Sequence, residues 1–561
     1  MVSEMSKRAG VFLFLLLAAL FLLVNRGAYQ GYFQDDEIDN LSWAPRLPAV
    51  DYLKAALSPR FQENNFRPVG HFYFYAAGRA FHLEFPGYVA AIQLLHLFNV
   101  WLIWLLARRL GAKPFAAAAA CVFFAFHMAL FDAIWKPMYV FDVLCAAFCL
   151  LSLLAYAHGR WVWSFVAFWL AYKSKELAVM LPLVLACYEL WFGQRRWVRL
   201  APFFLVSLSF GLQGMLSHAN RNNDYTFRFT PVALAATSAF YASRVFLVPW
   251  LGFALPVAAV VWRSRRTWLG LAMMAAFCFP LLFLPGRLFS AYCYLPFTGL
   301  ALAFAGVADA VPPAAVAAFL LLFAPIEYRE WRTERRATLA ADGEVRQWVG
   351  GAARLASAAP RIDAALCAGL PPSFHHWGAV GALRYLIRPN LEVRFLDDAG
   401  GQKPRAGERV AVLTWDPGER QVHSAIHTPG MGDLSYLRID SPASLWQLGE
   451  GWYGLEGDYR WIAPAASARL DRPEGARRFE LRLNVGQDML RQAGPPTVRI
   501  SLNGQNLEPR SFRKSGWQEA QWDLPAARPG PVQVTFQVTP GFQAPGDSRK
   551  LGIAVGAFGF R

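Results

Sequence analysis

The chain has 561 residues, of which 55% are hydrophobic, and its mean hydropathy of +0.26 exceeds that of a soluble domain of this length. The formal net charge is +16, but the basic residues form short clusters between apolar blocks, unlike the single basic stripe of a nucleic-acid-binding protein. The seven cysteines show no disulfide framework and no zinc spacing. The composition therefore excludes a soluble or nucleic-acid-binding protein and indicates that lipid surrounds much of the chain.

About eleven apolar segments approach the length of roughly 20 residues that a membrane-spanning helix needs. They are residues 9–24, 86–107, 114–131, 138–157, 161–173, 176–193, 200–217, 240–262, 267–284, 290–307 and 312–326. Arg244 and Pro249 interrupt the apolar run near residues 230–250, which could mark a re-entrant or interfacial helix. The predicted fold class is an α-helical polytopic membrane protein of about eleven spans, followed by a soluble region.

Alternate connections between these segments carry the basic clusters that the positive-inside rule places in the cytoplasm. They are Lys7/Arg8, Arg108/Arg109/Lys113, Arg160, Arg195/Arg196/Arg199 and Arg263/Arg265/Arg266. An odd number of spans then puts the C-terminal region outside a membrane of the bacterial inner-membrane type. The first segment could be a signal peptide, but residues 25–28 make a poor cleavage site, which favours an uncleaved anchor.

The connections on the predicted outer face hold most of the acidic and unusual polar residues of the membrane half. Ionisable groups near a membrane are costly, and they usually face a protein interior or a water-filled cavity. The adjacent acids Asp35, Asp36 and Glu37 repel one another, so they need a cation or a function to explain them. The other outer candidates are Arg67, His71, Asp132, Lys136, Lys175, Glu176, Arg287, Tyr292 and Tyr294. For Lys175 and Glu176, simple ion pairing is an alternative to a functional role.

Five motifs follow one another along the membrane half of the sequence. They are residues 32–37 (Tyr-Phe-Gln-Asp-Asp-Glu), 66–71 (Phe-Arg-Pro-Val-Gly-His), 95–99 (Leu-His-Leu-Phe-Asn), 174–176 (Ser-Lys-Glu) with Pro182, and Arg287 followed by 294–296 (Tyr-Leu-Pro). In this order they resemble the GT-C superfamily of polytopic glycosyltransferases, and most closely the branch that contains the tetratricopeptide-linked O-mannosyltransferases and their bacterial relatives. The resemblance covers roughly residues 10–326. No 34-residue helical repeat follows the membrane part, which leaves a protein acceptor in doubt.

The resemblance implies an inverting transfer, in which an acceptor hydroxyl attacks the anomeric carbon of a polyprenyl-phosphate sugar. A weak hydroxyl nucleophile needs a carboxylate base within hydrogen-bond reach, and the departing phosphate needs cations. Asp36 is the first candidate for the base, with Asp35 and Glu37 beside it, and Arg67, Lys175 and Arg287 are candidates for the phosphate. The expected pocket residues are His71, His96, Asp132, Lys136, Glu176, Tyr292 and Tyr294. For His96, on an apolar helix, a structural role is the favoured interpretation.

The expected partners are a polyprenyl-phosphate sugar donor, a hydroxyl acceptor on a protein, glycan or lipid, and membrane lipid, with no nucleic acid. No cofactor is certain and no metal ligand is assigned, although the acid cluster could hold Mg²⁺ or Mn²⁺. A transporter or flippase for lipid-linked sugars is the main alternative, but it would be expected to show charges near the midplane in pseudo-symmetric halves. A non-catalytic partner in polysaccharide assembly is a third interpretation.

The soluble region is predicted to hold two modules after a GT-C-like transmembrane domain at residues 1–328. Residues 331–360 favour a helix, and residues 391–395 and 410–413 favour strands, so residues 329–440 are expected to form a small α/β module. Alternating segments at 479–483, 498–502 and 532–538 predict a β-sandwich or jelly roll over residues 441–561. Asn503 and Gly504 are a hairpin signal. For Trp452 and Trp461, core packing is favoured over stacking on a sugar.

Overall fold

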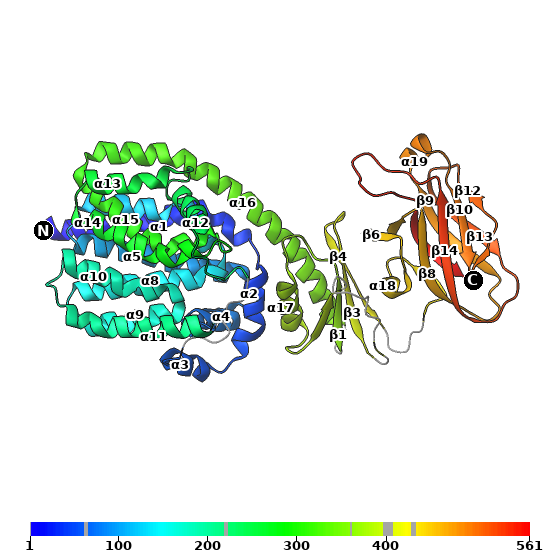
Figure 1. Ribbon diagram of the computed structural model, residues 1–561, viewed down its shortest axis with the longest axis horizontal. Coiled ribbons are helices and arrows are strands. Elements are labelled where there is room, and N and C mark those ends of the chain that lie inside the picture. Colours follow the sequence, from blue (N-terminus) through cyan, green and yellow to red (C-terminus); the bar gives the residue numbers. More distant parts are fainter. Residues whose placement is uncertain are drawn as a thin grey trace. The chain divides into compact units, whose positions relative to one another are not determined.

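The computed structural model describes residues 2–60, 66–217, 223–358, 362–395, 405, 408–427, 433–441 and 443–561. These residues form two compact units, Met1–Asp342 and Gly343–Arg561. Figure 1 shows that the first unit is built of helices and that the strands all belong to the second. Helix α16 (Pro313–Ala358) contains the boundary between the units. The apolar segment predicted at 312–326 and the soluble helix predicted from residue 331 are therefore one continuous helix, and residues 359 and 360 of that prediction lie outside the described residues.

The first unit contains α-helices of very different lengths, joined by short 3₁₀ turns. Besides α16, its helices are α1 (Val2–Val24), α2 (Asp35–Trp43), α3 (Ala49–Leu57), α4 (Pro68–Phe81), α5 (Phe85–Arg109), α6 (Pro114–Ala125), α7 (Phe131–Trp135), α8 (Val140–Ala157), α9 (Trp161–Ser174), α10 (Leu181–Trp191), α11 (Ala201–Ser217), α12 (Pro231–Val245), α13 (Leu255–Val261), α14 (Arg265–Cys278) and α15 (Tyr294–Ala310).

Five helical segments in the described part of the chain are long and apolar enough to cross a membrane, or six if one bent pair forms a single span. They are Gly10–Gln30, Phe85–Arg109, Pro137–Ala157, Arg265–Phe283 and Ser290–Ala310, with Pro114–Ala125 and Met128–Trp135 as the bent pair. These segments support a multi-pass membrane protein, but they do not confirm the expected count of eleven. Helices α9 and α10 have 14 and 11 residues, and at 1.5 Å per residue they are shorter than a hydrocarbon layer of roughly 30 Å.

The segment predicted as one span over residues 240–262 is broken in the structure. Helix α12 ends at Val245, and α13 begins only at Leu255. Between them, Leu247 and Trp250 adopt positive φ angles of 55° and 65° on either side of Pro249. Proline lacks the amide hydrogen that a helix interior requires. The segment is therefore not one continuous helix, in agreement with the interruption that Arg244 and Pro249 indicate in the sequence.

The first part of the second unit is a small α/β module with a four-stranded sheet. Its elements are β1 (Ala364–Ala368), α17 (His376–Leu386), β2 (Glu392–Phe395), β3 (Val410–Asp416) and β4 (Gln421–His427). The strand order is β2-β1-β3-β4, with β1 parallel to both neighbours and β4 antiparallel to β3. Four successive residues of β1 are buried, as expected for a strand in the middle of a parallel arrangement. The predicted strands at 391–395 and 410–413 are confirmed.

The remaining residues form two antiparallel sheets that share one apolar core. The five-stranded sheet has the order β11-β10-β14-β8 with β12 beside β10, and the six-stranded sheet has the order β13-β9-β15-β7-β6 with β5 beside β15. The elements are β5 (Tyr436–Arg438), α18 (Ser444–Gln447), β6 (Trp452–Glu456), β7 (Tyr459–Ile462), β8 (Ala465–Arg472), β9 (Arg478–Val485), α19 (Gln487–Gln492), β10 (Thr497–Leu502), β11 (Gln505–Asn506), β12 (Arg510–Ser511), β13 (Gly516–Asp523), β14 (Gly530–Thr539) and β15 (Ala554–Phe560).

These sheets confirm the strands predicted at 479–483, 498–502 and 532–538 and the hairpin at Asn503 and Gly504, whose φ angles are 47° and 86°. Strand β5 pairs with β15, so strands of the sheets begin before the predicted boundary at residue 441. Trp452 packs against the shared core, its Nε1 donates to the carbonyl of Ser467 (2.7 Å), and its ring lies 5.6 Å from that of Phe558. Packing thus accounts for Trp452.

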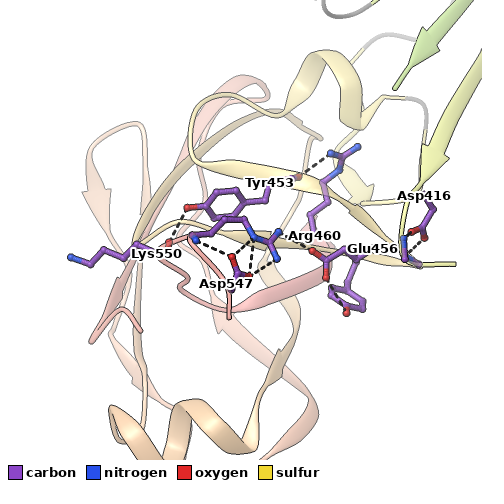
Figure 2. A network of polar contacts seen from close by, with 10 residues as sticks. Asp416, Tyr453, Glu456, Arg460, Asp547 and Lys550 are labelled. Atoms are coloured by element: carbon purple, nitrogen blue, oxygen red, sulfur yellow. Dashed lines mark hydrogen bonds and ion pairs between the residues drawn. The ribbon is translucent and has the colours of Figure 1, made fainter. Parts of the chain in front are cut away.

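Asp416, at the end of β3, connects the module to the sheets (Figure 2). Its carboxylate is fully buried and accepts hydrogen bonds from the amides of Gly418 (2.8 Å) and Glu419 (3.2 Å). Its other oxygen accepts from the amide of Gly457 (2.5 Å), in the turn between β6 and β7. Figure 2 also shows Asp547, which pairs with Arg549 (2.7 Å) near the same hairpin. A buried carboxylate is stable only when such donors surround it, so these contacts tie the hairpin to β3.

Candidate functional site

The three acids of the connection predicted to be the first on the outer face occupy the first turn of α2, and the structure separates their roles. Asp36 is exposed, Asp35 is half-buried and Glu37 is only 1% exposed. The N-terminus of a helix stabilises negative charge, which explains how three adjacent carboxylates are tolerated here. Asp36 and Asp35 are therefore the members of the group that a substrate can reach.

Glu37 stabilises the start of α2 and its contact with the segment before α8. Its Oε2 accepts from the amide of Gln34 (2.5 Å), which closes a capping box at the start of α2, and its Oε1 accepts from the amide of Met138 (3.0 Å). Burial raises the pKa of Glu37 to about 7, against the opposing effect of these two amides. Both carboxylate oxygens are thus engaged within the protein, and the geometry assigns Glu37 a positioning role beneath Asp36.

Arg67, immediately before α4, pairs with Glu176 of η6 (Glu176–Met180) at 2.8 Å. Its backbone amide donates to Nδ1 of His71 (2.8 Å), one turn into α4. Burial, together with the neighbouring Arg67 cation, lowers the pKa of His71 to about 3. His71 is therefore neutral at physiological pH, and it packs against the rings of Phe66 and Trp43 at 5.3 and 5.0 Å.

Lys175 is held between a carboxylate and an aromatic ring. Its Nζ lies 2.5 and 2.6 Å from the two carboxylate oxygens of Asp142 and 4.4 Å from the ring centre of Tyr292. Asp142 is 2% exposed in the first turn of α8, and it was not among the residues predicted from the sequence. The available signal was a single acid inside an apolar segment, which is costly in a membrane and marks a functional position by default.

Arg287 differs from the other two cations in its partners. Its guanidinium donates to the hydroxyl of Tyr292 (2.8 Å) and lies 4.5 and 4.6 Å from the ring centres of Tyr225 and Phe289. Among the described residues no carboxylate pairs with Arg287, and its buried Nε has no hydrogen-bond partner. A cation that is surrounded by aromatic rings and has an N–H group without an acceptor is suited to bind an anion.

These groups converge although they come from six separate segments. Tyr225 lies within electrostatic reach of Arg287, Tyr292, Asp36 and Arg67, and Arg67 lies within reach of Asp142 and Tyr292. We refer to the resulting set as the outer cluster. It consists of Asp36, Arg67, Asp142, Lys175, Glu176, Tyr225, Arg287 and Tyr292. The structure thus brings together an exposed carboxylate and all three predicted phosphate-binding cations.

The remaining predicted residues lie at the margin of the outer cluster or below it. Lys136 pairs with Asp132 at 2.9 Å, and both are about four-fifths buried at the side chain. His96 and Tyr294 are fully buried, and Nδ1 of His96 lies 2.8 Å from the Tyr294 hydroxyl. This pair fits the structural interpretation of His96. In the described part of the chain, no group of three or more His, Cys, Asp or Glu side chains is arranged to hold a metal ion.

Comparisons with known proteins give likenesses of structure alone. No family model and no curated protein sequence matches the chain. The crystal structure of ArnT from Cupriavidus metallidurans bound to undecaprenyl phosphate is 13% identical, with a TM-score of 0.46 over 72% of this chain and 93% of that one. The arabinofuranosyltransferase AftD from mycobacteria is 12% identical, with a TM-score of 0.44 over 98% of this chain and 58% of that one. Such distant likenesses assign no activity to this protein.

Proposed function

We propose that the chain is an inverting glycosyltransferase that moves a sugar from a polyprenyl-phosphate donor to a hydroxyl acceptor at the outer face of the membrane. The observation that carries the proposal is the outer cluster, in which the exposed Asp36 shares an electrostatic neighbour, Tyr225, with the cations Arg67 and Arg287. One of these cations, Arg287, has no carboxylate partner among the described residues. A proton acceptor facing anion-binding cations is the arrangement that displacement of a phosphate by a hydroxyl requires.

In the proposed step, the acceptor hydroxyl oxygen forms a bond to the anomeric carbon from the face opposite the phosphate. Asp36 takes the hydroxyl proton, while the bond between the anomeric carbon and the phosphate oxygen breaks and its electron pair leaves with the phosphate. Arg287 and Lys175 stabilise the negative charge that collects on the departing group. Lys175 and Arg67 are already neutralised by Asp142 and Glu176, so Arg287 is expected to contribute most.

Two other functions make different use of the same residues. A transporter of lipid-linked sugars would bind the donor without consuming it, and a non-catalytic assembly partner would not depend on the acids at all. Both alternatives predict that the sugar stays on its lipid. The test below also identifies the class of acceptor and the sugar that is transferred.

The test incubates the purified full-length protein with a panel of polyprenyl-phosphate monosaccharides and cell-envelope acceptors, followed by mass spectrometry of the products. Asp36→Asn keeps the size of the side chain and removes the proton acceptor. General-base catalysis contributes roughly 10² to 10⁴-fold, so we expect transfer to fall by about this factor while donor binding persists. Asp35→Asn is the matched control one residue away. Transfer at the parent rate by both single variants and by the double variant would refute a catalytic role for the acids.

A further inference from the structure

A groove of about 740 Å³ lies between α1, α6 and α16, on a part of the membrane unit that the outer cluster does not use. Its walls are formed by apolar side chains from all three helices. They include Leu20, Leu23, Val122, Phe126, Leu320 and Phe323. A groove with such walls in a membrane protein is suited to hold hydrocarbon chains.

One end of this groove is cationic. Arg26, just after α1, and Arg335 of α16 both line it. Arg335, Arg332 and Arg336 also line an adjoining hollow of about 580 Å³. Among the described residues, these four arginines form no ion pair with a carboxylate. Several cations beside a hydrocarbon-lined groove, without acids to neutralise them, favour an anionic ligand.

With a span at residues 312–326, as the sequence predicts, the length of α16 is compatible with a cationic end at the level of the lipid phosphates. Trp331 is 18 residues beyond Pro313, the first residue of α16, which corresponds to a rise of about 27 Å. This rise is close to the thickness of the hydrocarbon layer, roughly 30 Å. Tyr328 and Trp331 line the groove there, with their rings stacked 5.8 Å apart, as in the aromatic belts of membrane interfaces. The buried Nε1 of Trp331 has no hydrogen-bond partner in the described part of the chain.

We propose that this groove binds an anionic phospholipid of the surrounding bilayer, with the acyl chains against the apolar walls and the phosphate beside Arg26 and Arg335. A structural lipid is favoured over the sugar donor because the single acid in the described lining has a side chain that is only 13% exposed, whereas a catalytic base must reach its substrate. Glu327, its only acid in the described lining, accepts from the amide of Met128 (2.6 Å). It also lies eight residues from Arg335 along α16, about 12 Å by helix rise. The proposal does not rest on the glycosyltransferase function.

The test measures lipid retention by the full-length protein in detergent, using native mass spectrometry with added phosphatidylglycerol or the zwitterionic phosphatidylcholine. We expect the parent to retain phosphatidylglycerol preferentially. The double variant Arg26→Gln and Arg335→Gln should weaken this binding roughly tenfold or more, because each interfacial cation contributes to attraction of anionic lipid. The variant with lysine at both positions keeps the charge and should retain most of the binding.

The matched control replaces two exposed arginines of other connections, Arg160→Gln and Arg263→Gln, and should bind phosphatidylglycerol like the parent. Equal retention by the parent and the Arg26/Arg335 glutamine variant would overturn the proposal, as would equal retention of the two lipids. Displacement of phosphatidylglycerol by undecaprenyl phosphate, with the same dependence on the arginines, would instead assign the groove to a polyprenyl lipid. Asp36→Asn should leave lipid retention unchanged, so failure of the proposed enzymatic function would be recognised separately.

Discussion

Arg287 is distinguished from the other cations of the outer cluster by its unused hydrogen-bonding capacity. Its Nε is buried without a partner among the described residues, and its guanidinium contacts only a hydroxyl and aromatic rings there. A hydrogen bond to a charged group contributes about 1.5 to 3 kcal/mol, and 1.4 kcal/mol corresponds to a factor of ten. We therefore expect Arg287→Gln to weaken donor use by roughly 10- to 100-fold in kcat/KM.

The control for this prediction is Lys175→Gln, which removes a cation that Asp142 already neutralises. It should also lower activity, but through an uncompensated buried Asp142, so its thermal unfolding midpoint should fall as well. Arg287→Gln should leave that midpoint within a few degrees of the parent. Unchanged donor kinetics in Arg287→Gln would remove this residue from the phosphate site.

Glu37 gives a prediction about pH, because its pKa in the folded protein is about 7 and lies well above the usual value for a glutamate. Between about pH 5 and 7, the folded protein keeps a proton that the unfolded chain has lost. The contribution of Glu37 to stability therefore falls as the pH rises through this window, by on the order of 3 kcal/mol for a shift of this size. The lowered pKa of His71 acts in the opposite direction at acidic pH, so the prediction concerns the difference between two proteins. The unfolding midpoint of the parent should exceed that of Glu37→Gln by more at pH 5 than at pH 8.

Glu37→Gln also loses one side-chain oxygen that accepts from a backbone amide, so its midpoint should be lower than that of the parent at pH 5. The exposed Glu84→Gln, at the start of α5, is the matched control and should follow the parent at every pH. A variant at position 37 with the same slope as the parent would show that other groups cause the pH dependence.

At the scale of elements, α14 and α15 pack more closely than ordinary side chains allow. A Cβ atom on Gly270 would lie 2.3 Å from the amide nitrogen of Ala303 and 2.5 Å from the carbonyl oxygen of Gly299. Both are backbone atoms of α15, so relief requires the helices to separate. Small residues permit such contacts between membrane helices, and overpacking typically costs about 1 to 3 kcal/mol.

We therefore expect Gly270→Ala to lower the thermal unfolding midpoint of the detergent-solubilised protein. Gly350→Ala, within α16, is the control because no atom lies within 4 Å of its added Cβ. That change should be neutral or slightly stabilising, since alanine favours a helix by about 0.5 to 1 kcal/mol over glycine. If both variants melt with the parent, the close approach of α14 and α15 does not contribute to stability.

The sequence predicted some elements much better than others, for a physical reason. Strands β9, β10 and β14 show an alternating pattern that arises directly from one buried and one exposed face. In the membrane part nearly every side chain is apolar, so composition identifies a helix without fixing where it breaks. The interruption after Val245 and the continuity of α16 past residue 328 depend on local backbone geometry and packing that hydropathy does not report.

Six of the eight residues of the outer cluster, all but Asp142 and Tyr225, were predicted as a list of residues, but their geometry was not. The motifs indicated Arg67, Lys175 and Arg287, yet nothing in the sequence distinguished the paired cations from the one without a carboxylate. That distinction depends on Asp142, which lies 33 residues before Lys175 in the chain. In the same way, nothing in the sequence distinguished the three adjacent acids from one another, whereas the fold buries Glu37 and exposes Asp36.

At the scale of the whole molecule, the membrane orientation stays a prediction that the proposed chemistry requires. The outer cluster must face the side on which polyprenyl-linked sugars are displayed, and the basic connections must face the cytoplasm. Exposed positions suited to a test are Lys54 in α3, Arg160 before α9 and Arg528 between β13 and β14. None of these three side chains makes a contact within the described residues that its replacement would remove.

We expect Lys54→Cys and Arg528→Cys to react with a membrane-impermeant maleimide on intact cells, and Arg160→Cys to react only after the membrane is opened. The parent chain is the background control, since six of its seven cysteines are buried and Cys187 is half-buried. An odd number of crossings between Arg160 and Arg528 is necessary for this result, whatever the exact count of spans. Labelling of Arg160→Cys together with protection of Lys54→Cys would show the reverse orientation. In that case Asp36 and Arg287 would face the cytoplasm, and a transfer at the outer face would be excluded.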